Sequence, residues 1–466
     1  MGILFIFLNV IQKYYLYISV GIFALILRLI NLGNPRVFSM DEAYYVPDSA
    51  SILKYGYETY WGKRAEIPDE IAEQLLNNSW SNTLTYDASH PPLGKLVIAV
   101  GMFFFGTDNP IGWRISAAVC GTLVVILSMV LAYFIFKNKI VSLVSGFVMA
   151  IDPMAIAMSK TAHLDIFLTM FVLLGIIFGL LFYQNKKRIY LVLSFSVLGL
   201  ALGVKWSAVY YIAVLFILFV VLAYRESKKV DFKNILLMAA SSVSGYLLTW
   251  VVWFIYFPKE TFFDKIVFLI KNHLHLYERL SGIDSPHNYK SNAFEWIVQS
   301  HPTLLYKEMN NGLVSAVSSM PNIVLWYGAI ISLIFFAFMF FVKKVKVQYF
   351  SFLLVGIGAG WLPWMLVGDR TIFQYYTIVF QPYLYISLSF FIFILYKYFI
   401  TKRNWLGLLG RTALLAYIFV SIVISFRLYN GAVGLEEPKD NGSWAIFTTW
   451  QNANKEIGLY NIEQAE

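Results

Sequence analysis

Long apolar runs with hardly a charge recur along the whole chain, and they constrain its fold more than any other feature. Each run has about 20 residues, which is the length that crosses a bilayer. Of the 466 residues, 59% are hydrophobic and only 14% are charged. We therefore predict an all-α polytopic membrane protein. The eleven expected spans cover roughly residues 13–33, 113–136, 140–158, 163–184, 189–204, 206–224, 234–256, 322–342, 348–367, 371–396 and 408–428.

The positive charges indicate how these spans are oriented. A net charge of +9 would suggest a nucleic-acid partner in a soluble chain, but here Lys and Arg gather in short links between apolar runs. The links after the second, fourth, sixth, eighth and tenth spans read KNK, QNKKR, YRESKKVDFK, VKKVK and YKYFITKRN. The positive-inside rule places these links in the cytoplasm. We therefore expect a cytoplasmic N-terminus on a retained first span, a C-terminus outside, and no nucleic-acid partner.

Two long links, about 34–112 and 257–321, then fall outside the membrane. Each contains an amphipathic piece, KLVIAVGMFFFG from Lys95 and TFFDKIVFLIKNHLHLYERL from Thr261. Such pieces are expected to lie in the interface plane as helices. Residues 1–428 are predicted to form one transmembrane domain, followed by a polar outer tail at 429–466. The single cysteine, Cys120, excludes an internal disulfide.

Four cations break the topology rule at the outer ends of the spans. They are Arg114, Lys160, Lys205 and Arg370. A cation at mid-span costs roughly 2.5–3.5 kcal/mol on insertion scales, and less near the edge, so it usually has an anionic partner or lines a wet cavity. One interpretation is that each cation extends to the lipid headgroups or pairs with Asp152, Asp165 or Asp369. The other is a polar cavity that opens outward and receives an anion such as a lipid phosphate.

The motif search narrows the chemistry that such a cavity could perform. The chain has no P-loop, no HExxH and no GxSxG. GIGAG, from Gly356, lies inside an expected span and is better explained by close helix packing. Two adjacent carboxylates, Asp41 and Glu42, follow the first span. A carboxylate base with nearby cations suits transfer of a group from a lipid phosphate to an acceptor hydroxyl.

Seven motifs in register resemble the protein O-mannosyltransferases, in particular their bacterial branch, within the GT-C superfamily of polytopic glycosyltransferases. They run from about Met40 to Tyr383. The motifs are MDEAYYVPDS at Met40, HPPLGK at His90, GWRISAA at Gly112, SKTAHLDIFL at Ser159, GVKWSA at Gly203, HNYKS with Trp296 at His287, and RTIFQYYTIVFQPYL at Arg370.

The resemblance implies a GT-C architecture and an inverting transfer of mannose from polyprenyl-phosphate-mannose to Ser or Thr of exported proteins. Asp41 would be the general base, and Glu42 would hold the acceptor, orient the site or cap its helix. The donor phosphate would meet Arg114, Lys205 and Arg370. Supporting or purely structural roles fall to a further set: His90, Lys160, Asp165, His287, Tyr289 and Ser291.

The resemblance also implies a location and partners. Eukaryotic members carry a β-rich domain in the second long outer loop, and the 257–321 link is too short to hold it, which indicates the bacterial form. The expected place is the plasma membrane with an extracytoplasmic site. The expected partners are the polyprenyl-phosphate-mannose lipid, Ser/Thr-containing exported polypeptides and membrane lipids, with the protein export channel as a candidate. No cofactor is assigned, and a metal requirement is left open.

Two other functions remain open at this point. One is a GT-C transferase that uses the same carrier type to modify a glycan or a lipid, because its spans and carboxylates would look the same. The other is a transporter or flippase, in which intramembrane charges would line a path. The chain shows no pairing of inverted halves with interrupted helices, and this disfavours the transporter.

Overall fold

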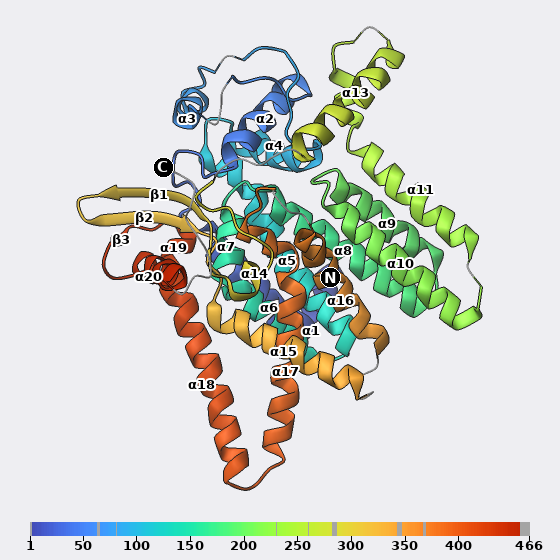
Figure 1. Cartoon of the computed structure of the whole chain (residues 1–466), viewed down its shortest axis with the longest axis vertical. Coiled ribbons are helices and arrows are strands. Elements are labelled where there is room, and N and C mark those ends of the chain that lie inside the picture. The colour runs from blue at the N-terminus through green and yellow to red at the C-terminus, as the bar shows by residue number, and fades with distance from the viewer. Residues whose placement is uncertain are drawn as a thin grey trace.

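The computed structural model describes residues 2–62, 66–80, 82–229, 231–259, 261–281, 287–342, 347–366 and 370–456. Long helices form the body of the molecule, and in the view of Figure 1 several shorter helices lie at the top and a small sheet lies at the left side. The helices of this body are α1 (Gly2–Leu29), α5 (Pro110–Phe136), α6 (Lys139–Ile151), α7 (Pro153–Lys160), α8 (Leu164–Asn185), α9 (Arg188–Leu202), α10 (Ala208–Ser227), α11 (Phe232–Leu248), α12 (Val251–Tyr256), α15 (Ile323–Phe341), α16 (Val347–Met365), α17 (Gln381–Ile400) and α18 (Trp405–Leu428).

Each of the eleven expected spans coincides with a helix or a broken helix pair of this set. Within the described residues, five helices are long and apolar enough to cross a membrane on their own, or six if the bent pair α6 and α7 counts as one span. Shorter apolar helices cover the other expected spans. The multi-pass character is thus supported, and the number eleven stays a prediction.

The bend between α6 and α7 is built on one buried carboxylate. The two helices meet at 62° because Pro153 begins α7 and cannot continue the hydrogen bonding of α6. Asp152 caps α7 by accepting from the backbone N–H of Ala155 at 3.0 Å. The same carboxylate accepts from Gln381 at 2.9 Å and from the Tyr385 hydroxyl at 2.6 Å, both on α17. Asp152 therefore ties the break to the opposite side of the bundle.

Glycines allow several helices to approach closely. A side-chain carbon at Gly199 of α9 would collide with the backbone carbonyl of Ser242, and one at Gly245 of α11 with that of Ser196. The two helices therefore pack backbone against backbone, as small residues permit. Gly356, at the start of GIGAG, faces the ring of Tyr383 in the same way, which confirms the packing interpretation of that motif.

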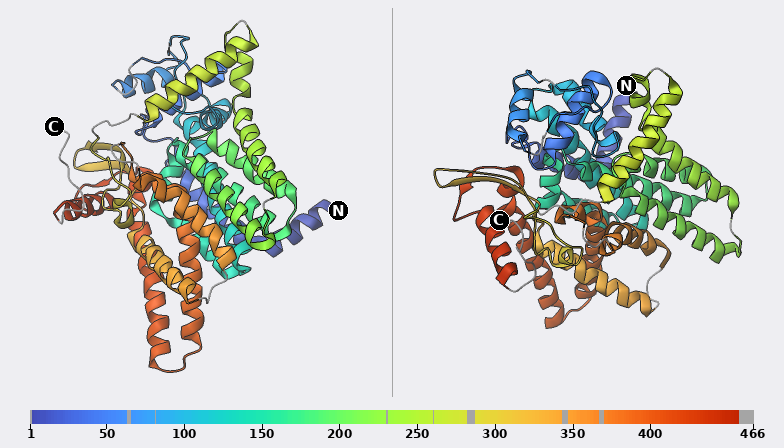
Figure 2. Two further views of the ribbon diagram at one scale, coloured as in Figure 1. Left: turned by 45° about the vertical axis from the view of Figure 1, so that its right-hand side comes forward. Right: turned by 45° about the horizontal axis from the view of Figure 1, so that its top comes forward.

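The first outer link folds into three helices rather than a loose loop. They are α2 (Glu42–Tyr55), α3 (Pro68–Leu76) and α4 (Leu93–Phe105). The second outer link contributes α13 (Phe262–Ser281) and the short α14 (Glu295–Val298). Both expected amphipathic helices are present as α4 and α13. These helices lie at the end of the molecule opposite to the turn between α17 and α18 (Figures 1 and 2).

A three-stranded antiparallel sheet departs from the all-α prediction. Strands β1 (Leu304–Asn310) and β2 (Leu313–Ser318) form a hairpin, and the short β3 (Glu437–Pro438) pairs with β2. Its two-residue turn is Asn311-Gly312, with positive φ at both residues, as this hairpin turn requires. The NNG sequence between two segments of alternating apolar and polar residues is a sequence signal for such a hairpin turn.

The C-terminal segment packs on this sheet and is more than a loose polar tail. It contains α19 (Asn430–Val433) and α20 (Ser443–Glu456). Trp444 and Phe447 of α20 form a buried cluster with β2 residues such as Val314. Asn31, at the end of the first span, donates to the carbonyl groups of Val433 and Gly434 at 3.0 and 2.9 Å.

Candidate active site

Asp41 and Glu42 stand at the start of α2, yet their side chains enter different surroundings. Asp41 is the N-cap residue of the helix and is only partly buried. Its Oδ2 accepts a hydrogen bond from the hydroxyl of Tyr375 at 2.8 Å and a longer one from the hydroxyl of Tyr45 at 3.3 Å. Tyr45 lies one helical turn after Asp41, where the two side chains meet. Asp41 is therefore held by neutral donors and keeps one oxygen open.

Glu42 is fully buried, and all its hydrogen bonds are internal. The guanidinium of Arg114 donates to both carboxylate oxygens, at 2.8 and 2.7 Å. The backbone N–H groups of Ser39 and Ala162 donate to the same carboxylate, each at 2.8 Å. The Arg114 guanidinium lowers the pKa of Glu42 even though burial alone would raise it. Glu42 thus joins the first outer loop, α5 and the start of α8.

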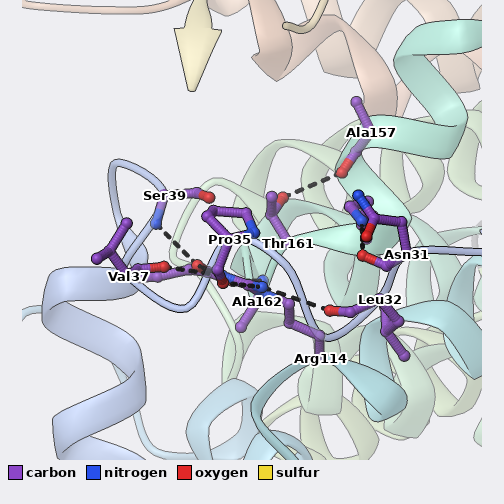
Figure 3. A network of polar contacts seen from close by, with 11 residues as sticks. Asn31, Leu32, Pro35, Val37, Ser39, Arg114, Ala157, Thr161 and Ala162 are labelled. Carbon is purple, nitrogen blue, oxygen red and sulfur yellow. Dashed lines mark hydrogen bonds and ion pairs between the residues drawn. The ribbon is translucent and has the colours of Figure 1, made fainter. Parts of the chain in front are cut away.

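Arg114 is saturated by this network. Its remaining N–H groups donate to the carbonyl groups of Leu32, Pro35 and Val37 (Figure 3). A planar guanidinium has five N–H donors, and protein acceptors take all five. The predicted contact of Arg114 with the donor phosphate therefore has no donor left to make it. For the same reason Glu42 is assigned to holding the loop rather than to catalysis.

Lys205 and Asp165 form a buried ion pair between the start of α8 and the link from α9 to α10. The ammonium group donates to both oxygens of Asp165, at 2.9 and 3.1 Å. It also lies 4.0 Å from the centre of the Tyr376 ring. Burial opposes the charge of Lys205, but Asp165 outweighs that effect and the pKa of Lys205 is raised. Lys205 therefore remains a cation. Its pairing with Asp165 is the ion-pair alternative expected from the sequence.

A cleft of about 150 Å³ lies beside this pair. Its charged lining residues are Lys205 and Arg370, and the Nε of Arg370 has no hydrogen-bond partner in the described structure. The guanidinium of Arg370 lies 5.6 Å from the ring centre of Trp364. The remaining lining residues are His90, Trp206, Ser207, Tyr210, Trp364 and Tyr277. A cationic, aromatic cleft of this kind suits a phosphate attached to an apolar chain.

Two adjacent tyrosines connect Asp41 to this cleft. Tyr375 and Tyr376 belong to the short helix η1 (Gln374–Val379), and their ring centres are 5.1 Å apart. Tyr375 holds Asp41, while the Tyr376 ring lies under Lys205. On the other side, the ring of Tyr45 lies 6.0 Å from that of His90, which lines the cleft. The candidate base and the two cations of the cleft thus share one neighbourhood.

The other residues that were predicted to support the site do not line the cleft. Lys160 is buried and donates to the carbonyl of Asn31, which links it to the Glu42 network rather than to the cleft. Ser291 accepts from Trp296 Nε1 at 2.9 Å and pairs with the backbone of Ile372, a packed loop contact. The exposed ring of His287 meets Phe373 edge-on at 4.9 Å.

Tyr289 is half buried and lies 5.4 Å from the ring of His301. Of the carboxylates considered as simple partners for the cations, Asp165 takes Lys205 and Asp152 accepts only neutral donors. Asp369 lies outside the described residues.

Several residues that contact the site in the structure have no role predicted from the sequence. Tyr45 and Tyr375 both lie inside quoted motifs, and the spacing of Tyr45 from Asp41 could have indicated it. Lys95, also in a motif, forms buried ion pairs with Glu58 at 2.6 Å and Asp48 at 3.5 Å. Among the described residues, no three His, Cys, Asp or Glu side chains are grouped to hold a metal ion.

Several known proteins are similar in sequence to this chain. Residues 103–258 match the family described as "Dolichyl-phosphate-mannose-protein mannosyltransferase". A polyprenol-phosphate-mannose–protein mannosyltransferase of Mycolicibacterium smegmatis is 25% identical over 437 residues, which cover 78% of this chain and 79% of that protein. A Corynebacterium glutamicum protein of the same name is 22% identical and matches 80% of this chain and 81% of its own length. The family match and these relatives bear out the resemblance to the protein O-mannosyltransferases.

Solved structures show that this chain has the fold of the GT-C membrane glycosyltransferases. One subunit of the Saccharomyces cerevisiae Pmt1–Pmt2 protein O-mannosyltransferase complex, bound to its sugar donor, aligns with a TM-score of 0.71 over 91% of this chain and 90% of that chain, at 12% identity. ArnT of Cupriavidus metallidurans, bound to undecaprenyl phosphate, aligns with a TM-score of 0.52 over 96% of this chain and 77% of its own, at 13% identity. The predicted fold class is confirmed, with the small sheet as an addition.

Proposed function

We propose that this chain transfers mannose from a polyprenyl-phosphate-mannose donor to Ser or Thr hydroxyl groups of exported polypeptides, with inversion at the sugar carbon. The family and the names of its relatives support the substrate classes. The observation that carries the proposal is the shared neighbourhood of a half-buried carboxylate, Asp41, and a cationic cleft, joined through Tyr375 and Tyr376.

Asp41 takes the role of general base. In the transfer, its carboxylate accepts the proton of the acceptor hydroxyl while the hydroxyl oxygen forms a bond to C1 of mannose. The bond between C1 and the phosphate oxygen breaks on the opposite face, and the polyprenyl phosphate leaves with its electron pair. The acceptor oxygen and the leaving phosphate lie on opposite faces of the sugar carbon, which gives inversion. Correct positioning of a base of this kind contributes roughly 10²–10⁴-fold to a rate.

Lys205 and Arg370 take the role of stabilising the leaving phosphate. Both line the cleft, and the unpartnered Nε of Arg370 is a donor that a phosphate oxygen would satisfy. Fixed cations gain most where charge develops in the transition state. The aromatic rings of Trp206 and Trp364 in the same lining suit the first isoprene units. This assignment replaces the predicted trio by two residues, since Arg114 is saturated elsewhere.

The proposed location is the plasma membrane, with the cleft on the extracytoplasmic side. The basic links QNKKR and YKYFITKRN support a cytoplasmic position for the turns after α8 and α17. The site lies at the ends of these helices that are farther from the basic links. It also includes residues of α2 and His90, which precedes α4. Acceptors would reach it as unfolded exported segments, with the protein export channel as candidate supplier and membrane lipids around the bundle.

The transfer assay is the decisive test of this function. Membranes that contain the chain are incubated with labelled polyprenyl-phosphate-mannose and a Ser/Thr-rich peptide from an exported protein. The proposal expects label in the peptide and none in a matched peptide whose Ser and Thr residues are all Ala. Label found only in lipid or glycan would overturn the protein acceptor and favour the alternative GT-C activity.

Two arginine variants test how the chain binds the phosphate of the sugar donor. Arg370→Ala is expected to raise the KM for the donor about tenfold or more, because a charge-assisted hydrogen bond contributes roughly 1.5–3 kcal/mol. Arg427→Ala removes an exposed arginine at the end of α18 and serves as the matched control, with no change in KM. An Arg370→Ala enzyme with the donor KM of the unmodified chain would remove Arg370 from the phosphate site.

A further inference from the structure

The two carboxylate oxygens of Asp41 are not equivalent. Oδ2 receives both tyrosine hydroxyl groups, from Tyr375 at 2.8 Å and from Tyr45 at 3.3 Å. No hydrogen bond from the described residues reaches Oδ1. The side chain is partly exposed, so Oδ1 is the oxygen that an incoming hydroxyl group can meet.

Tyr375 is held more firmly than a simple surface tyrosine would be. It is fully buried, and three rings fix its plane. Phe373 stacks on it at 5.5 Å with 9° between the planes, Tyr376 meets it edge-on at 5.1 Å, and His163 meets it edge-on at 5.4 Å. Its hydroxyl group donates to Oδ2 of Asp41 from this fixed position.

The backbone also holds this tyrosine in place. Tyr375 lies in η1, and the preceding Ile372 pairs with Ser291 through a backbone hydrogen bond of 2.9 Å. The second outer loop thus anchors the start of η1, while α17 follows directly at Gln381. Tyr375 reaches Asp41 from a part of the fold 334 residues away in sequence.

We propose that Tyr375 is a positioning residue that occupies Oδ2 of Asp41 and thereby presents Oδ1 as the only basic atom for the acceptor hydroxyl. The inference rests on the proposed role of Asp41 as the base. A neutral phenol suits this task because it fixes the carboxylate without cancelling its charge. The nearby cation Lys205 is paired with Asp165, so it does not compete for Asp41.

The proton balance of the step follows from this arrangement. The acceptor proton moves to Oδ1 as the new bond to C1 forms and the bond to the phosphate oxygen breaks. Tyr375 keeps its own proton throughout. A hydrogen bond from a neutral donor favours the charged form of the carboxylate that accepts it, and Tyr375→Phe removes one such bond.

Several titratable groups face Asp41 and must be considered in any pH profile. They come from each element packed around it: Tyr45 on α2, Tyr375 and Tyr376 on η1, Lys205 between α9 and α10, Asp165 on α8, and His287 between α13 and α14. Burial lowers the pKa of His287 below its usual value. His287 is thus the one group of this set that a profile between pH 5 and 7 could confuse with the base, so the experiment includes His287→Asn.

The experiment compares Tyr375→Phe with the unmodified full-length chain in lipid nanodiscs, using polyprenyl-phosphate-mannose and the Ser/Thr-rich peptide. The expected result is a fall in kcat of roughly tenfold, donor binding within about twofold, and an acidic limb of the kcat profile that moves up by about one pH unit. In His287→Asn the limb is expected to stay where it is in the unmodified chain.

Tyr383→Phe is the matched control. Tyr383 is a fully buried tyrosine on α17 whose hydroxyl has no hydrogen-bond partner in the described structure. Its loss should leave kcat and the acidic limb unchanged, which separates the loss of the Asp41 contact from a general effect of removing a buried hydroxyl group.

An unchanged kcat and an unmoved acidic limb in Tyr375→Phe would overturn the inference. If Tyr375→Phe does not fold, Tyr45→Phe removes the other donor from Oδ2 and should move the limb in the same direction by less. An unmoved limb there would overturn it equally. A fully active Asp41→Asn enzyme would instead remove the proposed base itself, so the two failures can be told apart.

Discussion

Two neighbouring carboxylates show how strongly surroundings decide a role. Asp41 is partly exposed, accepts only neutral hydroxyl donors and keeps one oxygen open. Glu42 is buried and receives four hydrogen bonds, two of them from the guanidinium of Arg114. The first arrangement leaves a carboxylate that can take up a proton. In the second arrangement, the carboxylate charge is paired with Arg114. Glu42 thereby holds the first outer loop against α5 and the residues that precede α8.

Glu42→Gln is therefore expected to damage stability more than Asp41→Asn. Removing one partner of a buried ion pair leaves an uncompensated charge and costs roughly 3–5 kcal/mol. The measurement is reversible unfolding in mixed SDS micelles at neutral pH. Asp41→Asn is the matched control, with a change of less than about 1 kcal/mol. Equal stability of the two variants would contradict the structural role of Glu42.

The stabilisation from Glu42 should also depend on pH in a defined direction. Arg114 lowers the pKa of Glu42 in the folded chain below the usual 4.5. The stabilising contribution is then fully present above pH 4.5 and is lost as the pH falls through the lower folded-state value. The difference in unfolding free energy between the unmodified chain and Glu42→Gln should shrink below about pH 4.5. A constant difference down to pH 3 would refute this linkage.

At the scale of elements, local patterns predicted the helices but not their mutual contacts. Apolar length indicated the spans, and amphipathic spacing indicated α4 and α13, because both signals are local. The hairpin β1–β2 was missed although its Asn-Gly turn was visible, since neighbouring apolar runs dominated the assignment. The ion pair of Glu42 with Arg114 joins residues 72 positions apart. Nothing in a single sequence encodes such a distance.

The break between α6 and α7 provides a prediction at this scale. Asp152→Ala removes the cap of α7 and leaves the hydroxyl of Tyr385 without its acceptor, which should cost about 2–4 kcal/mol in SDS unfolding. Asn404→Ala removes only the exposed cap of α18 and should cost about 1 kcal/mol. Similar losses for the two variants would show that Asp152 acts as a simple cap.

At the scale of the whole molecule, segments far apart in the sequence contact one another around the site and the sheet. The C-terminal segment packs on β2 and donates from Trp450 to the carbonyl of Gln299 at 2.8 Å. The first loop meets η1 at the site through Asp41 and Tyr375, and Ser291 of the second loop pairs with Ile372 just before η1. The predicted division into a transmembrane domain and a separate tail remains a prediction, and these contacts argue for joint folding of the two parts.

The proposed sidedness can be measured on this whole assembly. In a Cys120→Ala background, single cysteines are placed at exposed Asn310 of β1 and at exposed Thr401 after α17. A membrane-impermeant maleimide should label Asn310→Cys in intact cells and Thr401→Cys only after lysis. Labelling of Thr401→Cys in intact cells would place the cationic links outside and reverse the topology.

The central claim is that Asp41 acts as the base at a cleft that holds the donor. The most direct measurement is single-turnover mannose transfer by purified Asp41→Asn, with donor binding measured on the same preparation. The account predicts that the rate falls by roughly 10²–10⁴-fold while the donor Kd stays within about twofold. A variant that transfers mannose at the rate of the unmodified chain would contradict it.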